Sequence, residues 1–295
     1  MTNPYLITEP TGISFSGGRT SALMLFLTLE ANGGLPDGSY VTFANTGKEM
    51  PQTLDFVHEC ETRWDVPIVW LEMGDYIQNG VYKSGSKKGL PRWKVETIEV
   101  DYETASRNGE PFKRLCEQRK YLPNSVSRFC TAELKVRRIR DFLNARGDDW
   151  QQFIGIRADE PRRAAKMHGE RNDGHDMWCP MYLDGITKEN VDYFWRHMPF
   201  DLDLPMNNGV TDWGNCDLCF LKGYTKKQSI LRERPDLADW WIGMEDMMTP
   251  SAGSAALFRN DQPSYKTMQM IATDQPSLFE ENDFDDNTIP CFCGD

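Results

Sequence analysis

The sequence predicts an α/β fold in which helices cover both faces of a parallel sheet, and two observations favour it. Short apolar runs alternate with helix-like segments up to residue 71, in the order strand, helix, strand, helix, strand. This alternation is typical of a parallel sheet. A tight turn of small residues, Ser16-Gly17-Gly18, joins the first strand to the first helix. We therefore expect a Rossmann-like architecture with an appended, cysteine-containing helical subdomain.

Local signals place the individual elements. A strand around Ile13 leads into a helix over residues 20–31, which the glycines of Asn32-Gly33-Gly34 end. Pro51 suits the first turn of the next helix. The other expected strands cover 40–44, 68–71 and 153–156, and the other expected helices cover 53–64, 133–144, 187–197 and 226–234. Ligands of such sheets bind at the carboxyl ends of the strands, where Ser16-Gly17-Gly18 and a second turn, Asn45-Thr46-Gly47, both fall.

Composition divides the 295-residue chain into three parts. Residues 1–200 are expected to form the α/β domain, interrupted at about 74–115 by an insertion without clear periodicity that can fold over a substrate. Residues 201–273 are expected to form the helical subdomain with a C-x-x-C motif, and 274–295 an acidic tail that ends in cysteines. No run approaches eighteen apolar residues and no signal peptide is visible, so we expect a cytoplasmic protein and no membrane partner.

Charge is distributed unevenly along the chain. The net charge is −12, yet residues 107–171 hold sixteen Lys or Arg against nine Asp or Glu. A basic segment of this kind suits a polyanion, either the phosphates of a nucleotide or a nucleic-acid backbone. For the run Lys135–Arg140, a solvated helix face is an equal alternative.

The first turn has the chemistry of a phosphate site. Glycines allow close approach of a ligand to the backbone, hydroxyls donate to phosphate oxygens, and the helix dipole attracts an anion. The candidate ligand-binding residues here are Ser14, Ser16, Gly17, Gly18, Arg19, Thr20 and Ser21. It is not a Walker loop, because Gly18 stands where that motif has lysine, and the G-x-G-x-x-G pattern is absent. An ordinary surface turn is the alternative.

Five segments in order resemble one protein family. Residues 13–21 resemble the pyrophosphate-binding loop of the adenine nucleotide α-hydrolase (PP-loop) superfamily, and residues 41–53 resemble the second strand and turn of its phosphoadenosine phosphosulfate (PAPS) reductase branch. Residues 129–135, 155–163 and 215–220 match the same branch. Two departures stand out: Thr20 occupies a position where ATP-splitting members carry Asp, and Phe129-Cys130 replaces a Cys-Cys pair.

The resemblance implies an adenine nucleotide, PAPS or ATP, as ligand. The further residues that it implies for nucleotide binding are Asn45, Thr46, Gly47, Glu49, Gly155, Arg157 and Asp159. Arg157 is also a catalytic candidate, because a guanidinium can bind phosphate or sulfate with two hydrogen bonds. Glu49 is a candidate contact for Mg²⁺-bound water or ribose; a structural carboxylate at a helix start is its alternative.

The cysteines suggest a metal or cluster. Cys216 and Cys219 have the C-x-x-C spacing that lets two thiolates face one metal, and Cys130 begins a helix, which favours thiolate. The resemblance implies an iron–sulfur cluster, and we expect a 4Fe-4S cluster held by Cys130, Cys179, Cys216 and Cys219. Zinc at the same four positions, or a three-cysteine cluster with one open iron site, are the alternatives, and for Cys179 a buried free thiol is another.

The chain ends in Pro290-Cys291-Phe292-Cys293-Gly294-Asp295. The resemblance implies that Cys293 is a nucleophile on a mobile tail, which attacks the sulfonate sulfur and carries the product as a thiosulfonate. The Glu and His of the family setting are absent around it. A disordered end, or a latch that supplies a metal ligand, is the alternative.

Three functions follow. The first is reduction of an adenine sulfonucleotide next to an iron–sulfur cluster, with a thiol reductant as partner. The second is an ATP pyrophosphatase that adenylates a nucleic acid so that sulfur from a donor protein can be inserted, in the style of DNA phosphorothioation or tRNA thiolation. The third is a nucleotide-binding module without catalysis. The oligomeric state is not indicated by these residues.

Overall fold

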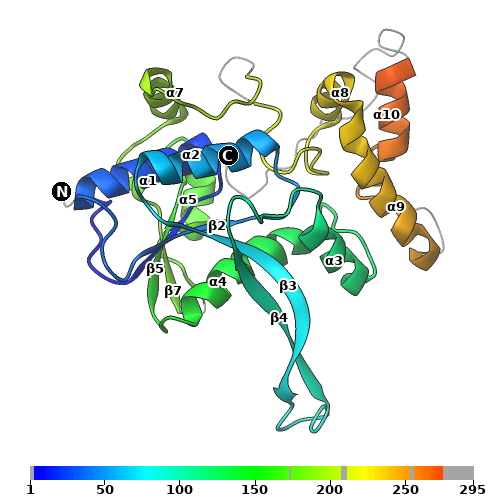
Figure 1. Ribbon diagram of the computed structural model, residues 1–295, viewed down its shortest axis with the longest axis horizontal. Coiled ribbons are helices and arrows are strands. Elements are labelled where there is room, and N and C mark those ends of the chain that lie inside the picture. Colours follow the sequence, from blue (N-terminus) through cyan, green and yellow to red (C-terminus); the bar gives the residue numbers. More distant parts are fainter. Residues whose placement is uncertain (1–2, 173, 207–210, 253–255, 275–295) are drawn as a thin grey trace.

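A seven-stranded sheet forms the centre of the protein (Figure 1). The computed structural model describes residues 3–172, 174–206, 211–252 and 256–274. The strands are β1 (Thr11–Ser14), β2 (Tyr40–Ala44), β3 (Ile68–Val81), β4 (Pro91–Val100), β5 (Trp150–Ile154), β6 (Arg171–Asn172) and β7 (His175–Trp178). Their order is β4-β3-β2-β1-β5-β7-β6. The five inner strands are mutually parallel, while β4 and β6 run antiparallel at the two edges.

Helices cover both faces of the sheet. In Figure 1, α1 and α2 lie on one face and α4 lies on the other. The longer helices are α1 (Arg19–Asn32), α2 (Pro51–Arg63), α3 (Glu110–Arg119), α4 (Arg137–Asn144), α7 (Lys188–His197), α8 (Tyr224–Glu233), α9 (Ala238–Ala252) and α10 (Tyr265–Asp274). The shorter ones are the π-helix η1 (Thr131–Val136), α5 (Pro161–Met167), α6 (Pro180–Leu183) and the 3-10 helix η2 (Pro235–Leu237). None of the helices in the described ranges is long and apolar enough to cross a bilayer.

The sheet confirms the predicted α/β class and shows where a ligand belongs. The chain leaves β1 toward β2 and β3, and later returns to the other side of β1 to form β5 and β7. The strand order therefore reverses between β1 and β5, and ligands of open α/β sheets bind outside the carboxyl ends of the strands at such a point. The Ser16-Gly17-Gly18 turn follows β1 directly.

The expected insertion at about 74–115 is largely a hairpin. β3 continues to Val81, ten residues beyond the predicted end of the strand, and pairs with β4. The second half of the segment returns to the sheet: the Gly109 N–H donates to the Gly47 carbonyl at 2.8 Å. The predicted helix over 133–144 likewise has two parts, since its first turns adopt the wider π geometry of η1. The sequence does not indicate this hairpin clearly, because its exposed part has no alternation of apolar and polar residues.

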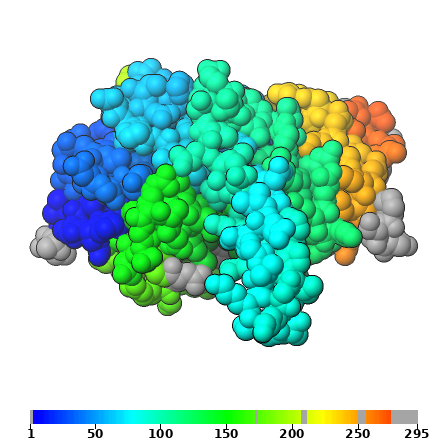
Figure 2. Space-filling view, turned by 60° about the horizontal axis from the view of Figure 1, so that its bottom comes forward, coloured from blue at the N-terminus to red at the C-terminus, as the bar shows by residue number. Residues whose placement is uncertain are grey.

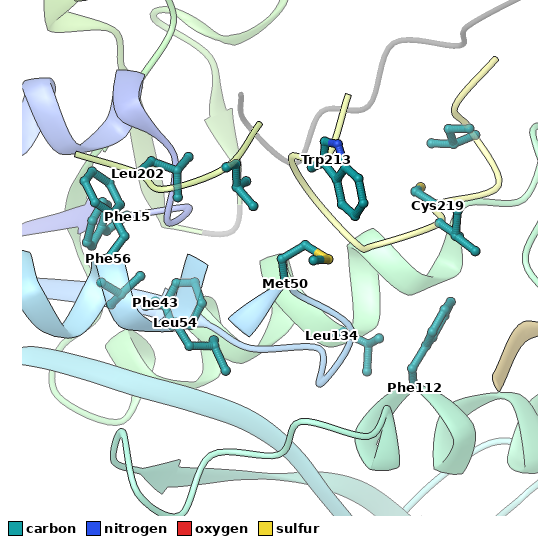
Figure 3. Close-up of a cluster of buried hydrophobic side chains, with 14 of the residues drawn as sticks. Phe15, Phe43, Met50, Leu54, Phe56, Phe112, Leu134, Leu202, Trp213 and Cys219 are labelled. Atoms are coloured by element: carbon teal, nitrogen blue, oxygen red, sulfur yellow. The ribbon is translucent and has the colours of Figure 1, made fainter. Parts of the chain in front are cut away.

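One apolar core extends from the sheet to the C-terminal helices. Ile13 and Phe43 of the sheet belong to the same buried cluster as Phe220, Trp241 and Phe258. In Figure 3, Met50 lies between the side chains that face the sheet and those near Cys219. The expected subdomain over 201–273 therefore packs on the α/β domain without a separate core among the residues that the structure describes.

A buried ion pair joins the two parts. Lys48, in the turn after β2, lies with its Nζ 2.7 Å from Asp217 Oδ2, and both side chains are less than one-tenth exposed. The Asp217 N–H donates to the Lys48 carbonyl at 2.8 Å, and Trp241 Nε1 donates to Asp217 Oδ1 at 2.8 Å. The Lys48 ammonium also lies 4.9 Å from the centre of the Trp240 ring. These contacts fix the Cys216–Cys219 loop against the turn that follows β2.

We expect the Lys48→Met substitution to lower the free energy of unfolding by about 3–5 kcal/mol, because it leaves the Asp217 carboxylate buried without its partner. Urea unfolding followed by circular dichroism measures this. The double variant Lys48→Met with Asp217→Asn is the control: it keeps an oxygen acceptor for Trp241 but removes the buried charge, so it should recover most of the loss. Equal destabilisation of both variants would contradict the account.

Candidate functional site

The Ser16-Gly17-Gly18 turn has a conformation that only glycine tolerates. Gly17 has a φ of +80°, and a Cβ on it would lie 2.7 Å from Thr53 Cγ2 of α2. Gly18 is the N-cap of α1, and no side chain in the described ranges caps this helix. The first N–H groups of a helix have no partner within it. The turn therefore presents the amino end of α1 at the carboxyl edge of the sheet.

Hydroxyl groups line this turn and are held in place. Ser21 Oγ accepts the Ser16 N–H at 3.2 Å, lies 2.9 Å from Ser16 Oγ, and donates to the Gly18 carbonyl at 3.0 Å. Ser14 Oγ accepts from Gln152 Nε2 at 2.9 Å. Ser16, Gly18 and Ser21 thus form one hydrogen-bonded loop, and Ser14 is held by β5.

The side chain of Arg19, a predicted ligand-binding residue, is already paired with a carboxylate. Its guanidinium forms a two-point ion pair with Asp201, in which Nε lies 2.7 Å from Oδ1. Trp195 Nε1 donates to the Arg19 carbonyl at 2.9 Å. Arg19 therefore ties the loop to the segment after α7.

Residues after β5 complete this side of the site. A Cβ on Gly155 would lie 3.3 Å from Ser21 Cα, so β5 passes close to the first turn of α1. Arg157 Nη1 donates to Thr20 Oγ1 at 3.2 Å, and Nε donates to Asp159 Oδ1 at 3.0 Å. The Arg157 side chain is 15% exposed. The structure thus brings Gly155, Arg157 and Asp159 beside the loop, with Arg157 already oriented by a carboxylate.

The turn after β2 is organised around Glu49. Its Oε2 accepts hydrogen bonds from the Thr46 N–H at 3.0 Å, Thr46 Oγ1 at 2.8 Å and the Lys48 N–H at 3.2 Å. Its Oε1 lies 3.2 Å from Lys135 Nζ. Asn45 Oδ1 accepts the N–H of Gly47, which has a φ of +77°. The Glu49 carboxylate therefore holds the turn together and reaches toward η1.

The cysteine loop lies directly against this turn. Glu49 and Cys216 form an antiparallel β-bridge, and Thr46 Oγ1 lies 3.6 Å from Cys216 Sγ. Beside them is a pocket of about 430 Å³, including the open solvent at its mouth. It is lined by Thr46, Phe112, Cys130, Thr131, Leu134, Lys135, Asn215, Cys216, Cys219, Phe220, Leu221 and Trp241. Three of the four predicted cysteine ligands thus line one pocket next to a predicted nucleotide turn.

Cys179 lies elsewhere. It is buried in a separate cluster with Ile156 and Ala164, and its N–H donates to His168 Nδ1 at 3.3 Å. Burial raises the pKa of its thiol to about 11, which disfavours the thiolate that binds metals. No group of three or more His, Cys, Asp or Glu side chains in the described part of the chain is arranged to hold a metal ion. The four predicted ligands do not form a ready-made cluster site.

Two lysines near the cysteines were not among the predicted site residues. Lys135 lines the pocket and pairs with Glu49, although its run of basic residues left a solvated face as an equal alternative. Lys227 of α8 is buried, with its Nζ 5.1 Å from the centre of the Tyr265 ring, and burial lowers its pKa to about 7. Lys135 is the last residue of the segment 129–135 that resembles the family, whereas Lys227 belongs to no motif. The predicted nucleophile Cys293 lies outside the described residues.

Comparison with known proteins bears on the part of the chain that carries the two turns, and the matched range ends before Cys216 and Cys219. The family model of the phosphoadenosine phosphosulfate reductase domain matches residues 11–182, which include both turns and Cys130. A nin region protein of Escherichia phage lambda, ORF290, is 32% identical over 218 residues, or 72% of this chain and 67% of the relative. A 37.8 kDa protein of Escherichia phage 186 is 28% identical over 202 residues, or 62% of this chain and 58% of that relative.

Both phage relatives are described as uncharacterized, so their names assign no reaction. The family match covers more than half of the chain, and it accords with the parallel sheet and with the glycine turn after its first strand. The chain belongs to the phosphoadenosine phosphosulfate reductase domain family.

Proposed function

We propose that this protein is an enzyme that binds an adenine nucleotide at the Ser16-Gly17-Gly18 turn and performs sulfur chemistry at the adjoining cysteine pocket. One observation carries the proposal: Thr46 belongs to the nucleotide turn after β2 and also lines the pocket, with its Oγ1 3.6 Å from Cys216 Sγ. Nucleotide and cysteines therefore meet at one edge of the sheet. A module that only binds nucleotides has no need of this pocket.

Different residues bind the phosphates and stabilise the charge that develops in the reaction. The N–H groups at the start of α1 and the hydroxyls of Ser16 and Thr20 bind the phosphates, and Ser21, whose hydroxyl donates to the Gly18 carbonyl, holds the loop in shape. Arg157, already hydrogen-bonded to Thr20, adds a guanidinium to the same charge. Lys135 places a cation on the pocket wall, where negative charge develops when the bond to the nucleotide breaks.

The favoured reaction is reduction of a sulfonucleotide. The Cys293 thiolate attacks the sulfonate sulfur and forms a sulfur–sulfur bond, while the sulfur–oxygen bond to the phosphate breaks and the nucleotide leaves with the electron pair. A thiol reductant then attacks the Cys293 sulfur, releases sulfite and forms a disulfide with Cys293, which a second thiol reduces. The support is the family and the pocket beside the nucleotide turn.

An iron–sulfur cluster stays a prediction. Its support is that Cys130, Cys216 and Cys219 line one pocket, whereas Cys179 lies in another cluster and does not fit as the fourth ligand. Iron and acid-labile sulfide in protein purified without oxygen, compared with the Cys216→Ser and Cys219→Ser variants, test it. Zinc at the same cysteines is the alternative outcome.

The second candidate is an ATP pyrophosphatase that activates a nucleic acid for sulfur insertion. It is favoured by the exposed end of the β3–β4 hairpin, residues 77–94, which is basic and which a reductase of small nucleotides does not need. The predicted Mg²⁺ belongs to this reaction. Glu49, the candidate contact for Mg²⁺-bound water, already accepts three hydrogen bonds from its own turn and pairs with Lys135.

Product analysis separates the two reactions. We expect sulfite from PAPS with a thiol reductant, and we expect Cys293→Ser to abolish it while PAPS still binds, because only the attacking sulfur is lost. Cys60→Ser is the matched control, since Cys60 is buried away from the pocket. Release of pyrophosphate from ATP with Mg²⁺ and a nucleic acid, without sulfite from PAPS, would instead establish the second candidate.

We expect the Gly17→Ala substitution to weaken nucleotide binding by roughly tenfold or more, about 1.4 kcal/mol, because the added methyl group displaces Thr53 or the loop itself. Isothermal titration with PAPS and ATP measures this. Gly33→Ala is the control: Gly33 also has a positive φ, +68°, but a Cβ there meets no atom within 4 Å. The left-handed backbone conformation costs each variant about 1–2 kcal/mol of stability, so the two differ mainly in the contact with Thr53. Unchanged affinity in Gly17→Ala would contradict the assigned site.

A further inference from the structure

The hairpin of β3 and β4 forms an arm that projects from the body of the protein. In Figure 2 it extends beyond the rest of the surface as the cyan lobe at the bottom. Every residue from Ile77 to Lys94, called the arm below, is exposed. Two paired strands that leave the body so completely bury little apolar surface, so folding alone does not account for their length.

All charged side chains of the arm are positive. It contains five basic residues and no acidic one, in a chain whose net charge is −12. The basic residues are Lys83, Lys87, Lys88, Arg92 and Lys94. Within the described residues, none of these five side chains forms an ion pair with a carboxylate. The Lys87 ammonium lies 5.7 Å from the centre of the Tyr82 ring. The arm is therefore a cationic ribbon on an acidic protein.

Large apolar side chains lie among these charges. Trp93 is 57% exposed and Leu90 is 55% exposed, although both types are usually buried. Cross-strand register pairs Ile77 with Lys94 and Gln78 with Trp93. Neighbouring residues of a strand point to opposite faces, so Lys94 and Trp93 serve opposite faces of the ribbon. Both faces thus offer contacts to a ligand that surrounds the arm.

The base of the arm is held rigidly. Arg138 of α4 is buried, and its Nη1 donates to the Glu96 carbonyl at 2.9 Å and to Thr97 Oγ1 at 2.7 Å. Its Nε donates to the Glu133 carbonyl of η1 at 2.9 Å. The same helix pair carries Lys135 of the cysteine pocket. Because these hydrogen bonds fix the base of the arm, its basic side chains keep one orientation relative to the pocket.

We propose that the arm binds duplex DNA by inserting into the major groove. A polyanion is the ligand that a cationic ribbon on an acidic protein selects. The major groove of B-form DNA is about 12 Å wide and admits a two-stranded β-ribbon, whereas the major groove of an A-form RNA helix is deep and narrow. The basic side chains contact the phosphates on both sides, and Trp93 and Leu90 contact apolar parts of the groove. DNA binding by the arm suits the second candidate reaction, and it can be tested whichever reaction the pocket performs.

Fluorescence anisotropy with a labelled duplex of about 20 base pairs, two helical turns, tests the proposal. For the full chain we expect binding that weakens with salt. Lys87→Gln with Lys88→Gln should lower the slope of log affinity against log salt by about 1.8, since each phosphate contact contributes about 0.9, and should reduce affinity at least roughly tenfold. Trp93→Ser should weaken binding without changing that slope.

Arg196→Gln with Lys266→Gln is the matched control, because it removes two exposed positive charges on α7 and α10, away from the arm. Its affinity and slope should equal those of the unaltered chain. Equal losses in the control and arm variants, or an unchanged slope in the arm variant, would overturn the proposal. So would binding to duplex RNA or to anionic lipid vesicles that exceeds binding to DNA. Unchanged nucleotide affinity in each variant shows that it is folded, and separates this test from that of the reaction.

Discussion

The buried ion pair between Lys48 and Asp217 is the constraint on which the arrangement of the site depends. Lys48 belongs to the turn that follows β2, and Asp217 lies between the two cysteines of the C-x-x-C motif. Taking both charges out of water is costly unless each stays paired, so the pair admits one position of the cysteine loop relative to the sheet. Thr46 and Cys216 come into contact as a result. The proposed sulfur chemistry next to a nucleotide depends on this contact.

Much of the nucleotide side could be predicted from the sequence, because its signals are local. The apolar run 40–44 forms β2 with the predicted bounds, and Gly17 of the first turn has the positive φ and the close contact that favour glycine. The two turns come together because the carboxyl ends of neighbouring parallel strands share one edge of the sheet. The roles of these residues in binding remain predictions that the arrangement supports.

The parts that could not be predicted depend on contacts between distant segments. Cys179 was expected beside the other three cysteines, yet it packs with Ile156 and Ala164 in a cluster that does not contain Cys216. The Glu49 to Lys135 ion pair joins residues far apart in the chain, and neither neighbourhood indicates the other. The arm lacked a strand signal because both its faces are exposed, so no alternation of apolar and polar residues marks it.

The central claim is that a nucleotide bound at the glycine turn extends to the cysteine pocket. The rate of Cys216 alkylation, followed by mass spectrometry with and without saturating PAPS or ATP, tests it most directly, since Cys216 is partly exposed while Cys60 and Cys116 are buried and serve as internal references. The account predicts that bound nucleotide slows alkylation of Cys216 with the same concentration dependence as binding. Alkylation of Cys216 at an unchanged rate, in protein shown to be fully occupied, would contradict it.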